Sequence, residues 1–420
     1  MDKFVINGPA KLRGKIKVDG SKNAALPILA ATLLIEKGET VIRNVPPLMD
    51  IYTLSQMLEY IGARVTYDGV ARVVTVNAEH LTENTAPYEL MRKMRGSFLV
   101  LGPLLARLGE ARVSLPGGCV LGARPVDYHI KGFASLGAKV TEDSGYVIAR
   151  GKPLEGGAVY FDKPSHTGTE NLLYGAVMAK RKTVITNAAC DPEVVDTASF
   201  LNAAGARIHG AGTPNIVVEP VKRLRAIEYS VSGDRLVAGT YAIGAAITGG
   251  QLEISGVPSE QLAVVLHKLL EMGCQIETKR ASFTVRGPKR LTATNVTAFP
   301  YPGFPTDLQA CISAACAIAT GTSHIRDTVF VDRFAHAMEF RRLGADISAA
   351  GGEAVINGVE RLQGAGVMAP DIRAGAGIAL ACLVAHGQSE LSRVYHLDRA
   401  YYRLEEQLSR LGADIKRMKA

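Results

Sequence analysis

Apolar residues recur along the chain in two alternating patterns. The first is the spacing of an amphipathic helix, which turns one apolar face toward a core. It is clearest at Leu262, Val265, Leu266, Leu269 and Leu270. The second is a pair of short strands with period two joined by a turn, as in ARVTYDGVARVVTV (residues 63–76), where Asp68-Gly69 is a hairpin turn signal. The chain is therefore expected to alternate helices with strands.

A short phrase follows each amphipathic stretch. It consists of a glycine between apolar or small residues and then a polar and a β-branched residue, as in IGARV (61–65) and LGADI (343–347). Its glycine occurs at Gly62, Gly137, Gly205, Gly273, Gly344 and Gly412, so successive copies are 68 to 75 residues apart. Such regular spacing indicates six internal repeats.

Each repeat also contains a short strand and a second helix that is apolar nearly all round. The strands, which we expect to lie at sheet edges, read GETVIRN, GEARVSL, KTVITN, GQLEISG, GTSHIRD and GQSELSR. A helix such as residues 310–320, ACISAACAIAT, has no polar face and must be enclosed by other elements. The pattern predicts an α/β protein of six βαβαββ-like repeats in two domains, with helices inside and sheets around them. We expect residues 1–22 and 231–420 in one domain, which the N-terminal strand joins, and residues 23–230 in the other.

The enclosed helices are expected to begin at polar segments. These are DGSKN at Asp19, MRGS at Met94, SHTGTE at Ser165, SGDR at Ser232, FPTD at Phe304 and DIRAG at Asp371. A helix N-terminus has unpaired N–H groups and a partial positive charge, which suit a phosphate or carboxylate. Two interpretations stay open, because residues such as Ser21, Thr306 and Asp307 can also be plain caps. The cations Lys22, Arg95 and Arg373 oppose the helix dipole and therefore destabilise the fold unless an anion compensates them.

Composition narrows the classes of partner. A chain of 420 residues suits two domains, and its net charge of +8 favours anionic partners. It has no long run of Lys and Arg and no basic stripe interleaved with aromatic residues, which favours a small anion over nucleic acid. The N-terminus lacks a signal peptide pattern, and the apolar run 24–35 is too short to span a bilayer. We expect a cytoplasmic location without membrane insertion; no pattern indicates an oligomeric state.

Motifs for metals and nucleotide cofactors are absent from the sequence. None of the six cysteines forms a C-x-x-C pair, and neither G-x-G-x-x-G after a strand nor a Walker lysine occurs, so we expect no metal, NAD or ATP site. Cys119 follows Gly117-Gly118 and precedes Arg124. It is either a small buried residue or a thiol made reactive by a nearby cation. His129 and His166 carry weaker signals and can be hydrogen-bonded structural groups.

Seven stretches together carry a resemblance to a known family. They are DGSKNAALP, LPGGCVLGARPVDYH, DPEVVDTASFL, FPTDLQA, VFVDRF, DIRAGA and YHLDRAYYRLEEQL. Over essentially its full length the chain resembles the UDP-N-acetylglucosamine enolpyruvyl transferases. The resemblance implies an inside-out α/β barrel fold with two domains and a closing loop. It also implies transfer of enolpyruvyl from phosphoenolpyruvate to the 3-hydroxyl of UDP-N-acetylglucosamine with release of phosphate and without a cofactor. That is the first committed step of peptidoglycan synthesis, to which cell shape and cell division are linked.

The resemblance also implies roles for individual residues. Cys119 holds the position of the family's loop cysteine, which is proton donor, covalent partner of phosphoenolpyruvate and the target of fosfomycin. The phosphoenolpyruvate ligands match Lys22, Arg95, Arg124 and Arg399. The nucleotide-sugar contacts match Asn23, Arg124, Pro125, Val126, Asp127, Tyr128, Lys163, Ser165, Asp307 and Val329. Asp371 and Arg373 match residues near the reacting centre, and Arg333 matches a further arginine of the cleft.

Asp307 is the candidate base for the sugar hydroxyl, and Cys119 is the candidate acid for the methylene carbon. Two positions depart from the family pattern: His166-Thr167 stands where Val-Gly is frequent, and Asp191 stands where glutamate is common. Two rival readings stay open. One is enolpyruvylshikimate phosphate synthase, which shares fold and donor but uses a shikimate acceptor. The other is a non-catalytic scaffold that binds anions or nucleic acid.

Overall fold

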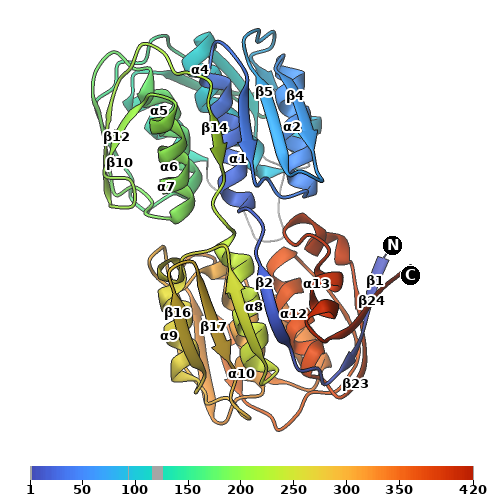
Figure 1. The fold of residues 1–420 in the computed structure, drawn as a ribbon. Coiled ribbons are helices and arrows are strands. Elements are labelled where there is room, and N and C mark those ends of the chain that lie inside the picture. Colours follow the sequence, from blue (N-terminus) through green and yellow to red (C-terminus); the bar gives the residue numbers. More distant parts are fainter. Residues whose placement is uncertain (1, 93, 116–125, 420) are drawn as a thin grey trace. The chain divides into compact units, whose positions relative to one another are not determined.

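The computed structural model describes residues 2–92, 94–115 and 126–419. The chain divides into two units (Figure 1). Residues 20–232 form one of them, called the middle unit here. Residues up to 19 together with those from 233 onward form the other, the terminal unit.

The middle unit contains three repeats of helices and strands. Its helices are α1 (Lys22–Ala31), η1 (Thr32–Leu34), α2 (Met49–Ile61), α3 (Tyr88–Met91), η2 (Arg95–Val100), α4 (Leu101–Leu108), α5 (Asp127–Ser135), α6 (His166–Val177) and α7 (Pro192–Ala203). Its strands are β3 (Thr40–Arg43), β4 (Arg64–Asp68), β5 (Val73–Asn77), β6 (Thr85–Ala86), β7 (Glu110–Ser114), β8 (Lys139–Asp143), β9 (Tyr146–Arg150), β10 (Ala158–Tyr160), β11 (Thr183–Thr186), β12 (Arg207–His209), β13 (Asn215–Glu219) and β14 (Glu228–Ser230).

The terminal unit repeats the same plan. Its helices are α8 (Arg235–Ile247), η3 (Ser259–Leu262), α9 (Ala263–Glu271), η4 (Thr306–Leu308), α10 (Gln309–Ala317), α11 (His336–Arg342), α12 (Ile372–Val384), η5 (Val394–Arg399) and α13 (Leu404–Arg410). Its strands are β1 (Asp2–Gly8), β2 (Arg13–Lys17), β15 (Gln251–Ser255), β16 (Gln275–Lys279), β17 (Ser282–Arg286), β18 (Val296–Ala298), β19 (Thr322–Asp327), β20 (Asp346–Ala350), β21 (Glu353–Asn357), β22 (Gly366–Met368), β23 (Gly387–Ser392) and β24 (Asp414–Lys419).

The strands of the described residues form six four-stranded sheets, three in each unit, and this confirms the six predicted repeats. In each sheet a short strand pairs in parallel with its neighbour, and two antiparallel strands follow, as in the order β10-β11-β13-β12. The prediction that GETVIRN and its five counterparts are edge strands is wrong. They form β3, β7, β11, β15, β19 and β23, each of which is second in its sheet because a short parallel strand covers its outer edge.

Two of the short parallel strands belong to a different unit from the helix that follows them in sequence. β2 precedes α1 of the middle unit but pairs with β15, whereas β14 precedes α8 of the terminal unit but pairs with β3. The N-terminal strand β1 pairs with β23 and β24 and so joins the last repeat, as expected. The first and last strands of the chain therefore close one sheet.

The glycine of the repeated phrase ends the second helix of each repeat. All six of these glycines have φ between 86° and 111°. Residues with a Cβ rarely adopt this left-handed conformation, which lets the helix stop and the following strand begin. The backbone therefore explains why glycine recurs at this point of every repeat.

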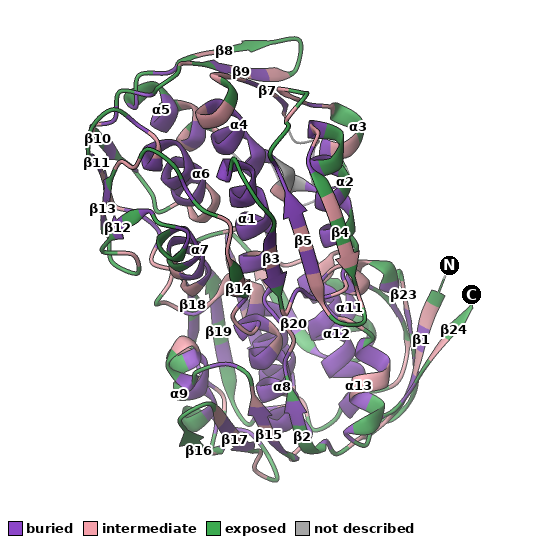
Figure 2. Cartoon of the chain, turned by 45° about the horizontal axis from the view of Figure 1, so that its top comes forward, coloured by how far each residue is buried: buried purple, intermediate pink, exposed green. Residues whose placement is uncertain are grey.

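The first helix of each repeat is enclosed, as its apolar sequence predicted. Every residue of α10 is buried, and so are nearly all residues of α8 and α12, which pack against one another and against α10 (Figure 2). The outer helices bury one face only. On α9, Val265 and Leu266 are buried, but Leu270 is 49% exposed, so its place in the predicted apolar face is wrong.

The Asp68-Gly69 turn signal marks a real hairpin between β4 and β5. The connection has four residues, because the Asp68 carboxylate accepts hydrogen bonds from the N–H groups of Val70 and Ala71. Among the described residues, no helix is both long and apolar enough to cross a membrane.

Candidate active site

In the terminal unit, polar residues gather where the three inner helices begin. Asp234 caps α8 by accepting from the N–H groups of Leu236 and Val237. Asp371 caps α12 in the same way, accepting from the N–H groups of Arg373 at 2.7 Å and Ala374 at 3.0 Å. These segments start helices as predicted, and Asp371 acts there as a cap.

Asp307, in the 3₁₀ turn before α10, lies between two buried arginines. Arg333 donates from Nη1 to Oδ1 of Asp307 at 2.7 Å, and Arg373 donates from Nε to Oδ2 at 2.9 Å. The arginine side chains are each 7% exposed and the Asp307 side chain 23%. Each carboxylate oxygen therefore has a guanidinium donor.

A second layer of hydrogen bonds holds Arg333. Its Nη1 also donates to the hydroxyl of Thr306 at 3.1 Å, and that hydroxyl donates to Oδ2 of Asp327 at 2.6 Å. Oδ1 of Asp327 accepts from the N–H groups of Val329 and Phe330. The interpretation of Thr306 as a helix cap is wrong, because its hydroxyl joins this network instead.

Arg373 is held on its other side by a tyrosine. Its Nη1 donates to the Tyr401 hydroxyl at 3.4 Å, which lies 3.0 Å from the hydroxyl of Thr240 on α8. Burial opposes the charge on Arg373, but the Asp307 carboxylate, with smaller effects of Tyr401 and Asp234, outweighs it, so the pKa of Arg373 is raised. Asp234 begins α8, Asp307 precedes α10 and Arg373 lies at the start of α12, so the starts of the three helices are electrostatically coupled.

Arg399 ends the 3₁₀ segment η5, which packs against α12. Burial lowers the pKa of His396 in the same segment, and the positive charge of Arg399 lowers it further, while Asp371 acts in the opposite direction. Both charges therefore lie close enough to act on one imidazole. This places Arg399 at the same end of the unit as the start of α12.

In the middle unit, Lys22 is the first residue of α1 and is paired with a carboxylate. Its Nζ lies 3.0 Å from Oδ2 of Asp50 in the first turn of α2, and the two side chains are 10% and 5% exposed. Ser21 caps α1 by accepting from the N–H of Ala24, which is one of the two interpretations that the sequence left open. The anion that compensates the cation at this helix start is therefore a protein carboxylate, as it is for Arg373.

A second cluster of polar residues in the middle unit lies at the start of α6. Ser165 caps the helix by accepting from the N–H of Gly168 at 3.2 Å, and Lys163 is exposed just before it. Tyr128, near the start of α5, packs edge-on against Phe161 with ring centroids 6.0 Å apart. This contact links the segment around Asp127 to the segment that begins α6.

His166, one of the two departures from the family pattern, forms an ion pair within α6. Its Nε2 lies 3.3 Å from Oε1 of Glu170, whose side chain is fully buried. Burial alone would lower the pKa of His166, but Glu170, with Asp191 and Glu193, raises it to about 10. Asp191 is the other departure, so the two unusual residues act on each other electrostatically.

His129 is a structural group, one of the alternatives that the sequence left open. Its Nδ1 lies 2.9 Å from the amide nitrogen of Asn171, and its Nε2 lies 3.3 Å from the hydroxyl of Thr167. Burial lowers the pKa of His129 to about 4. Both ring nitrogens of this buried histidine are therefore engaged by neutral side chains of α6.

The structure brings part of the predicted site together. Asp307, Arg333 and Arg373 are in direct contact, and Asp371, Val329 and Arg399 lie on segments bonded to or packed against them. Lys22 and Asn23 begin α1, and Val126, Asp127 and Tyr128 begin α5. Cys119, Arg124 and Pro125 lie outside the described residues, as does the side chain of Arg95.

Sequence reasoning missed four partners of the predicted residues: Asp50, Asp327, Tyr401 and Thr240. Tyr401 and Asp327 stand inside or beside the quoted stretches YHLDRAYYRLEEQL and VFVDRF, which was a usable signal. Asp50 and Thr240 lie in helices with no motif. Within the described residues, no group of three or more His, Cys, Asp and Glu side chains is arranged to hold a metal ion.

Comparison with known proteins gives consistent matches over the whole chain. The family model described as EPSP synthase (3-phosphoshikimate 1-carboxyvinyltransferase) matches residues 6–408. Relatives named UDP-N-acetylglucosamine 1-carboxyvinyltransferase are 49% identical in Myxococcus xanthus (strain DK1622) and 47% identical in Geobacter metallireducens (strain ATCC 53774 / DSM 7210 / GS-15), with 100% of both chains covered in each case.

Two solved structures share the fold at low identity. The enolpyruvyl transferase NikO from Streptomyces tendae has a TM-score of 0.89 at 23% identity, covering 100% of this chain and 99% of that one. EPSP synthase from Acinetobacter baumannii has a TM-score of 0.78 at 19% identity, with 100% of both chains covered. These likenesses concern the fold alone, and they confirm the fold expected from the six repeats and from the resemblance.

Proposed function

The chain belongs to the carboxyvinyltransferase family whose model it matches, and from this premise we propose that it transfers enolpyruvyl from phosphoenolpyruvate to the 3-hydroxyl of UDP-N-acetylglucosamine and releases phosphate. The choice of acceptor rests on relatives that are 46–49% identical over 99–100% of this chain, whose name contains this nucleotide sugar. The reaction is a step of peptidoglycan synthesis.

The observation that carries the chemistry is the Asp307 carboxylate between two buried guanidinium groups. Oxygen atoms of Asp307 accept from Arg333 and Arg373 at 2.7 and 2.9 Å. Enolpyruvyl transfer needs a base for the sugar hydroxyl and cations for a substrate that carries a carboxylate and a phosphate. One cluster of the terminal unit supplies both kinds of group.

The steps conserve atoms and charge without a redox partner. An acid, for which Cys119 is proposed, protonates the terminal methylene carbon of phosphoenolpyruvate. The central carbon becomes electrophilic and bonds to the sugar 3-oxygen, whose proton passes to Asp307. The resulting ketal carries phosphate and sugar on one carbon. A methyl proton then returns to the Cys119 thiolate as the bond from that carbon to the phosphate oxygen breaks, which restores the double bond and releases phosphate.

An anionic substrate changes the partners of the arginines. Guanidinium groups bind carboxylate and phosphate through two parallel hydrogen bonds. One carboxylate side chain does not use all the N–H donors of an arginine, so donors remain for a substrate. When Arg373 turns to the substrate, one oxygen of Asp307 loses its donor and is able to accept the hydroxyl proton. Lys22 is proposed to exchange Asp50 for the substrate in the same way, and Arg399 to add a further cation.

The remaining residues are proposed to bind the substrates. The nucleotide sugar is assigned to Asn23, Arg124, Pro125, Val126, Asp127, Tyr128, Lys163, Ser165, Asp307 and Val329, and phosphoenolpyruvate also to Arg95 and Arg124. We propose that the two units act as domains and that the segment carrying Cys119 closes over the reacting groups to exclude water. The cytoplasmic location, the link to cell shape and division, and sensitivity to fosfomycin belong to the same proposal.

Phosphate release with two acceptors tests the proposal. The protein is mixed with phosphoenolpyruvate and either UDP-N-acetylglucosamine or shikimate 3-phosphate, and free phosphate is measured over time. We expect release with the nucleotide sugar only, and its loss by at least about 100-fold in Cys119→Ala. Release with shikimate 3-phosphate alone would establish the rival acceptor, and no release with either would favour a binding scaffold.

A further inference from the structure

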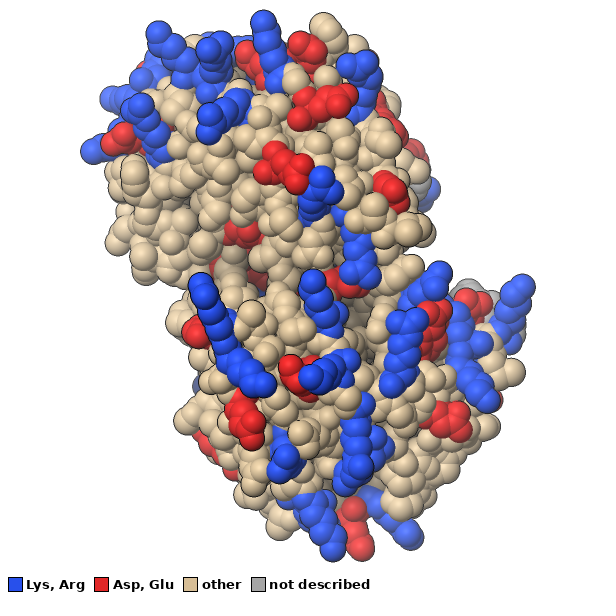
Figure 3. Space-filling view, viewed as in Figure 1, with Lys and Arg blue, Asp and Glu red and all other residues tan. Residues whose placement is uncertain are grey.

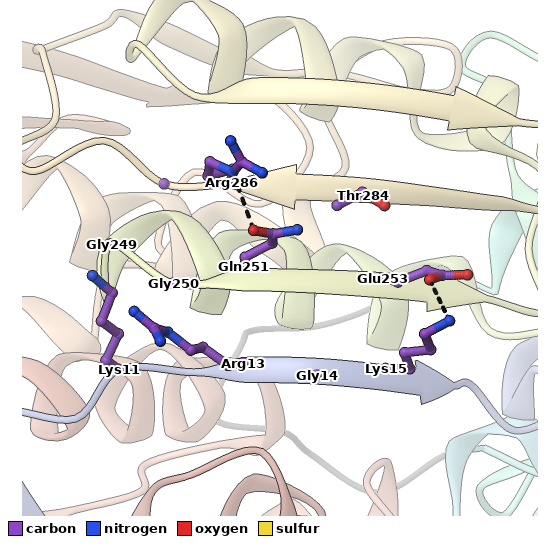
Figure 4. A pocket seen from close by; sticks show the side chains of 11 residues that line it. Lys11, Arg13, Gly14, Lys15, Gly249, Gly250, Gln251, Glu253, Thr284 and Arg286 are labelled. Atoms are coloured by element: carbon purple, nitrogen blue, oxygen red, sulfur yellow. Dashed lines mark hydrogen bonds and ion pairs between the residues drawn. The ribbon is translucent and has the colours of Figure 1, made fainter.

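The terminal unit contains a basic pocket on the outer face of one sheet. It has a volume of about 590 Å³ and is lined by residues of β2, β15 and β17 and of the loops at their ends (Figure 4). Its charged members are Lys11, Arg13, Lys15, Glu253 and Arg286. None of these residues belongs to the candidate active site.

The strand register explains why these side chains share one face. Arg13, Gln251 and Arg286 are direct neighbours across β2, β15 and β17, and Lys15, Glu253 and Thr284 form the next row. Their alternate residues, such as Leu252 and Val285, are buried on the opposite face. The pocket is therefore built by the pleat of the sheet and does not depend on a flexible loop.

The charges in the pocket are unequally compensated. Lys15 is neutralised by Glu253, whose carboxylate lies 3.0 Å from its Nζ. Arg286 donates from Nε to the amide oxygen of Gln251 at 3.1 Å and from Nη1 to that of Gln275 at 3.5 Å, and these neutral groups orient it without cancelling its charge. Figure 4 shows the Arg286–Gln251 bond and places Lys11 beside Arg13 at one end of the pocket.

No hydrogen bond or ion pair of the Lys11 and Arg13 side chains occurs within the described part of the chain. With Arg286, three positive charges thus share one pocket without a counter-charge of their own. Lys and Arg side chains also outnumber Asp and Glu on the face of the terminal unit shown in Figure 3. The local charge is therefore favourable for an anion.

Glycine backbone leaves part of the pocket wall free of side chains. A Cβ on Gly250 would lie 2.0 Å from the carbonyl oxygen of Leu12, and one on Gly287 would lie 2.6 Å from that of Ala245. Both residues must therefore be glycine, and together with Gly14 and Gly249 they line the pocket with backbone only. This gives a ligand room beside the cationic side chains.

The pocket lies at the opposite end of α8 from the candidate active site. Gly249 and Gly250 follow the last turn of α8, whereas Asp234 caps its first turn beside Arg373. The 13 residues of the helix separate the two ends by about 20 Å. The helix C-terminus carries about half a negative charge, which three cations outweigh.

We propose that this pocket binds a small molecule with two neighbouring phosphate groups, separately from the candidate active site. Arg13 and Arg286 stand on strands that flank β15, so their backbones are about 10 Å apart, a span that two long side chains can close onto one diphosphate. Guanidinium groups match phosphate oxygens in pairs. Among the residues that the structure describes, the lining includes no aromatic side chain on which a base could stack, which disfavours single-stranded nucleic acid.

Calorimetric titration with inorganic pyrophosphate tests the proposal on the full-length protein. Because the cations are exposed, we expect a dissociation constant on the order of 0.1–1 mM for the wild type. The double variant Arg13→Gln/Arg286→Gln is expected to bind about tenfold more weakly. The matched control Lys17→Gln/Lys279→Gln removes two cations from the same face of the same sheet outside the pocket, and should change affinity less than twofold. Both variants should keep the phosphate-release activity of the wild type.

Other outcomes would overturn the proposal. Equal pyrophosphate binding by the wild type and the arginine variant would place the anion elsewhere, for example in the candidate active site. Equal weakening in both variants would show only a general effect of surface charge. If single-stranded DNA or vesicles of anionic lipid bind in a manner that needs Arg13 and Arg286 while pyrophosphate does not, the face serves a macromolecule or a membrane surface.

Discussion

Arg373 and Asp307 are 66 residues apart in sequence and join the starts of two inner helices through a hydrogen bond of 2.9 Å. Arg333 occupies the other carboxylate oxygen of Asp307. A carboxylate with a cation on each oxygen is a weak base, so proton transfer to Asp307 requires that one arginine leave. When one arginine turns to an anionic substrate, an oxygen of Asp307 loses its donor, and Asp307 is then able to act as the base.

Asp307→Asn is expected to lower kcat by at least about 100-fold, because the amide keeps the shape of the side chain but cannot accept the hydroxyl proton. The measurement is the rate of phosphate release at saturating substrates. Asp414→Asn, an exposed carboxylate of β24, is the control and should keep the wild-type rate. If Asp307→Asn is folded by circular dichroism and within about threefold of the wild-type kcat, the base is another group.

Lys22 and Asp50 are expected to be coupled in stability. Removing one member of a buried ion pair takes a compensating charge away from the other, which destabilises a fold by about 3 kcal/mol, whereas removing both members costs less. Lys22→Met should therefore be more destabilised than Lys22→Met/Asp50→Leu. Urea unfolding of the wild type, both single variants and the double variant gives the coupling energy. A coupling below about 0.5 kcal/mol would contradict the pairing.

The repeated architecture was predictable because it rests on local signals. The glycine at positions such as Gly62 and Gly344 is needed wherever a helix must stop in a left-handed conformation, so the phrase recurs in the sequence itself. The enclosed helices were predictable for the same reason, because a helix without a polar face must be covered by other elements on all sides. The short parallel strands were not, because a three-residue strand such as β18 carries no periodicity.

The partners in the site were less predictable than its members. Lys22 and Arg373 stood out because a cation at a helix start is unfavourable by itself. Their counter-charges come from other helices: Asp50 belongs to the second helix of the same repeat, and Asp307 lies one repeat before Arg373. Such pairings depend on how helices pack in three dimensions, which the apolar spacing within one helix does not encode. The pairing of β2 with β15 and of β14 with β3 was unpredictable for the same reason, because it too depends on packing between distant segments.

The His166–Glu170 pair predicts a dependence of stability on pH. The pKa of His166 is raised to about 10 in the folded state from an ordinary value near 6.5, so the folded protein holds this proton more tightly. Its contribution is fully present below about pH 6.5 and is lost as the pH rises toward 10. Between pH 6 and pH 9, wild-type stability should fall by on the order of 1–2 kcal/mol more than that of His166→Gln, measured by urea unfolding.

The protein offers a matched control for this titration. His267 and Glu271 form the same i, i+4 pair at 3.2 Å on α9, but the His267 side chain is 68% exposed. His267→Gln should therefore have nearly the same free energy of unfolding as the wild type, because solvent screens an exposed pair. An identical pH dependence of the wild type and His166→Gln would show that His166 does not hold an extra proton in the folded state.

Arg417 is expected to stabilise the segment that carries Arg399. It donates to both carboxylate oxygens of Asp398 at 3.0 and 2.5 Å and to Glu405 at 2.7 Å. Arg417→Leu should lower the free energy of unfolding by about 2 kcal/mol and raise the KM for phosphoenolpyruvate, because Asp398 directly precedes Arg399. Arg417→Lys should recover little of the lost stability, because lysine lacks the planar guanidinium group that binds both carboxylate oxygens. Lys416→Leu, exposed on the same strand, is the control; equal unfolding curves for the two leucine variants would contradict the role.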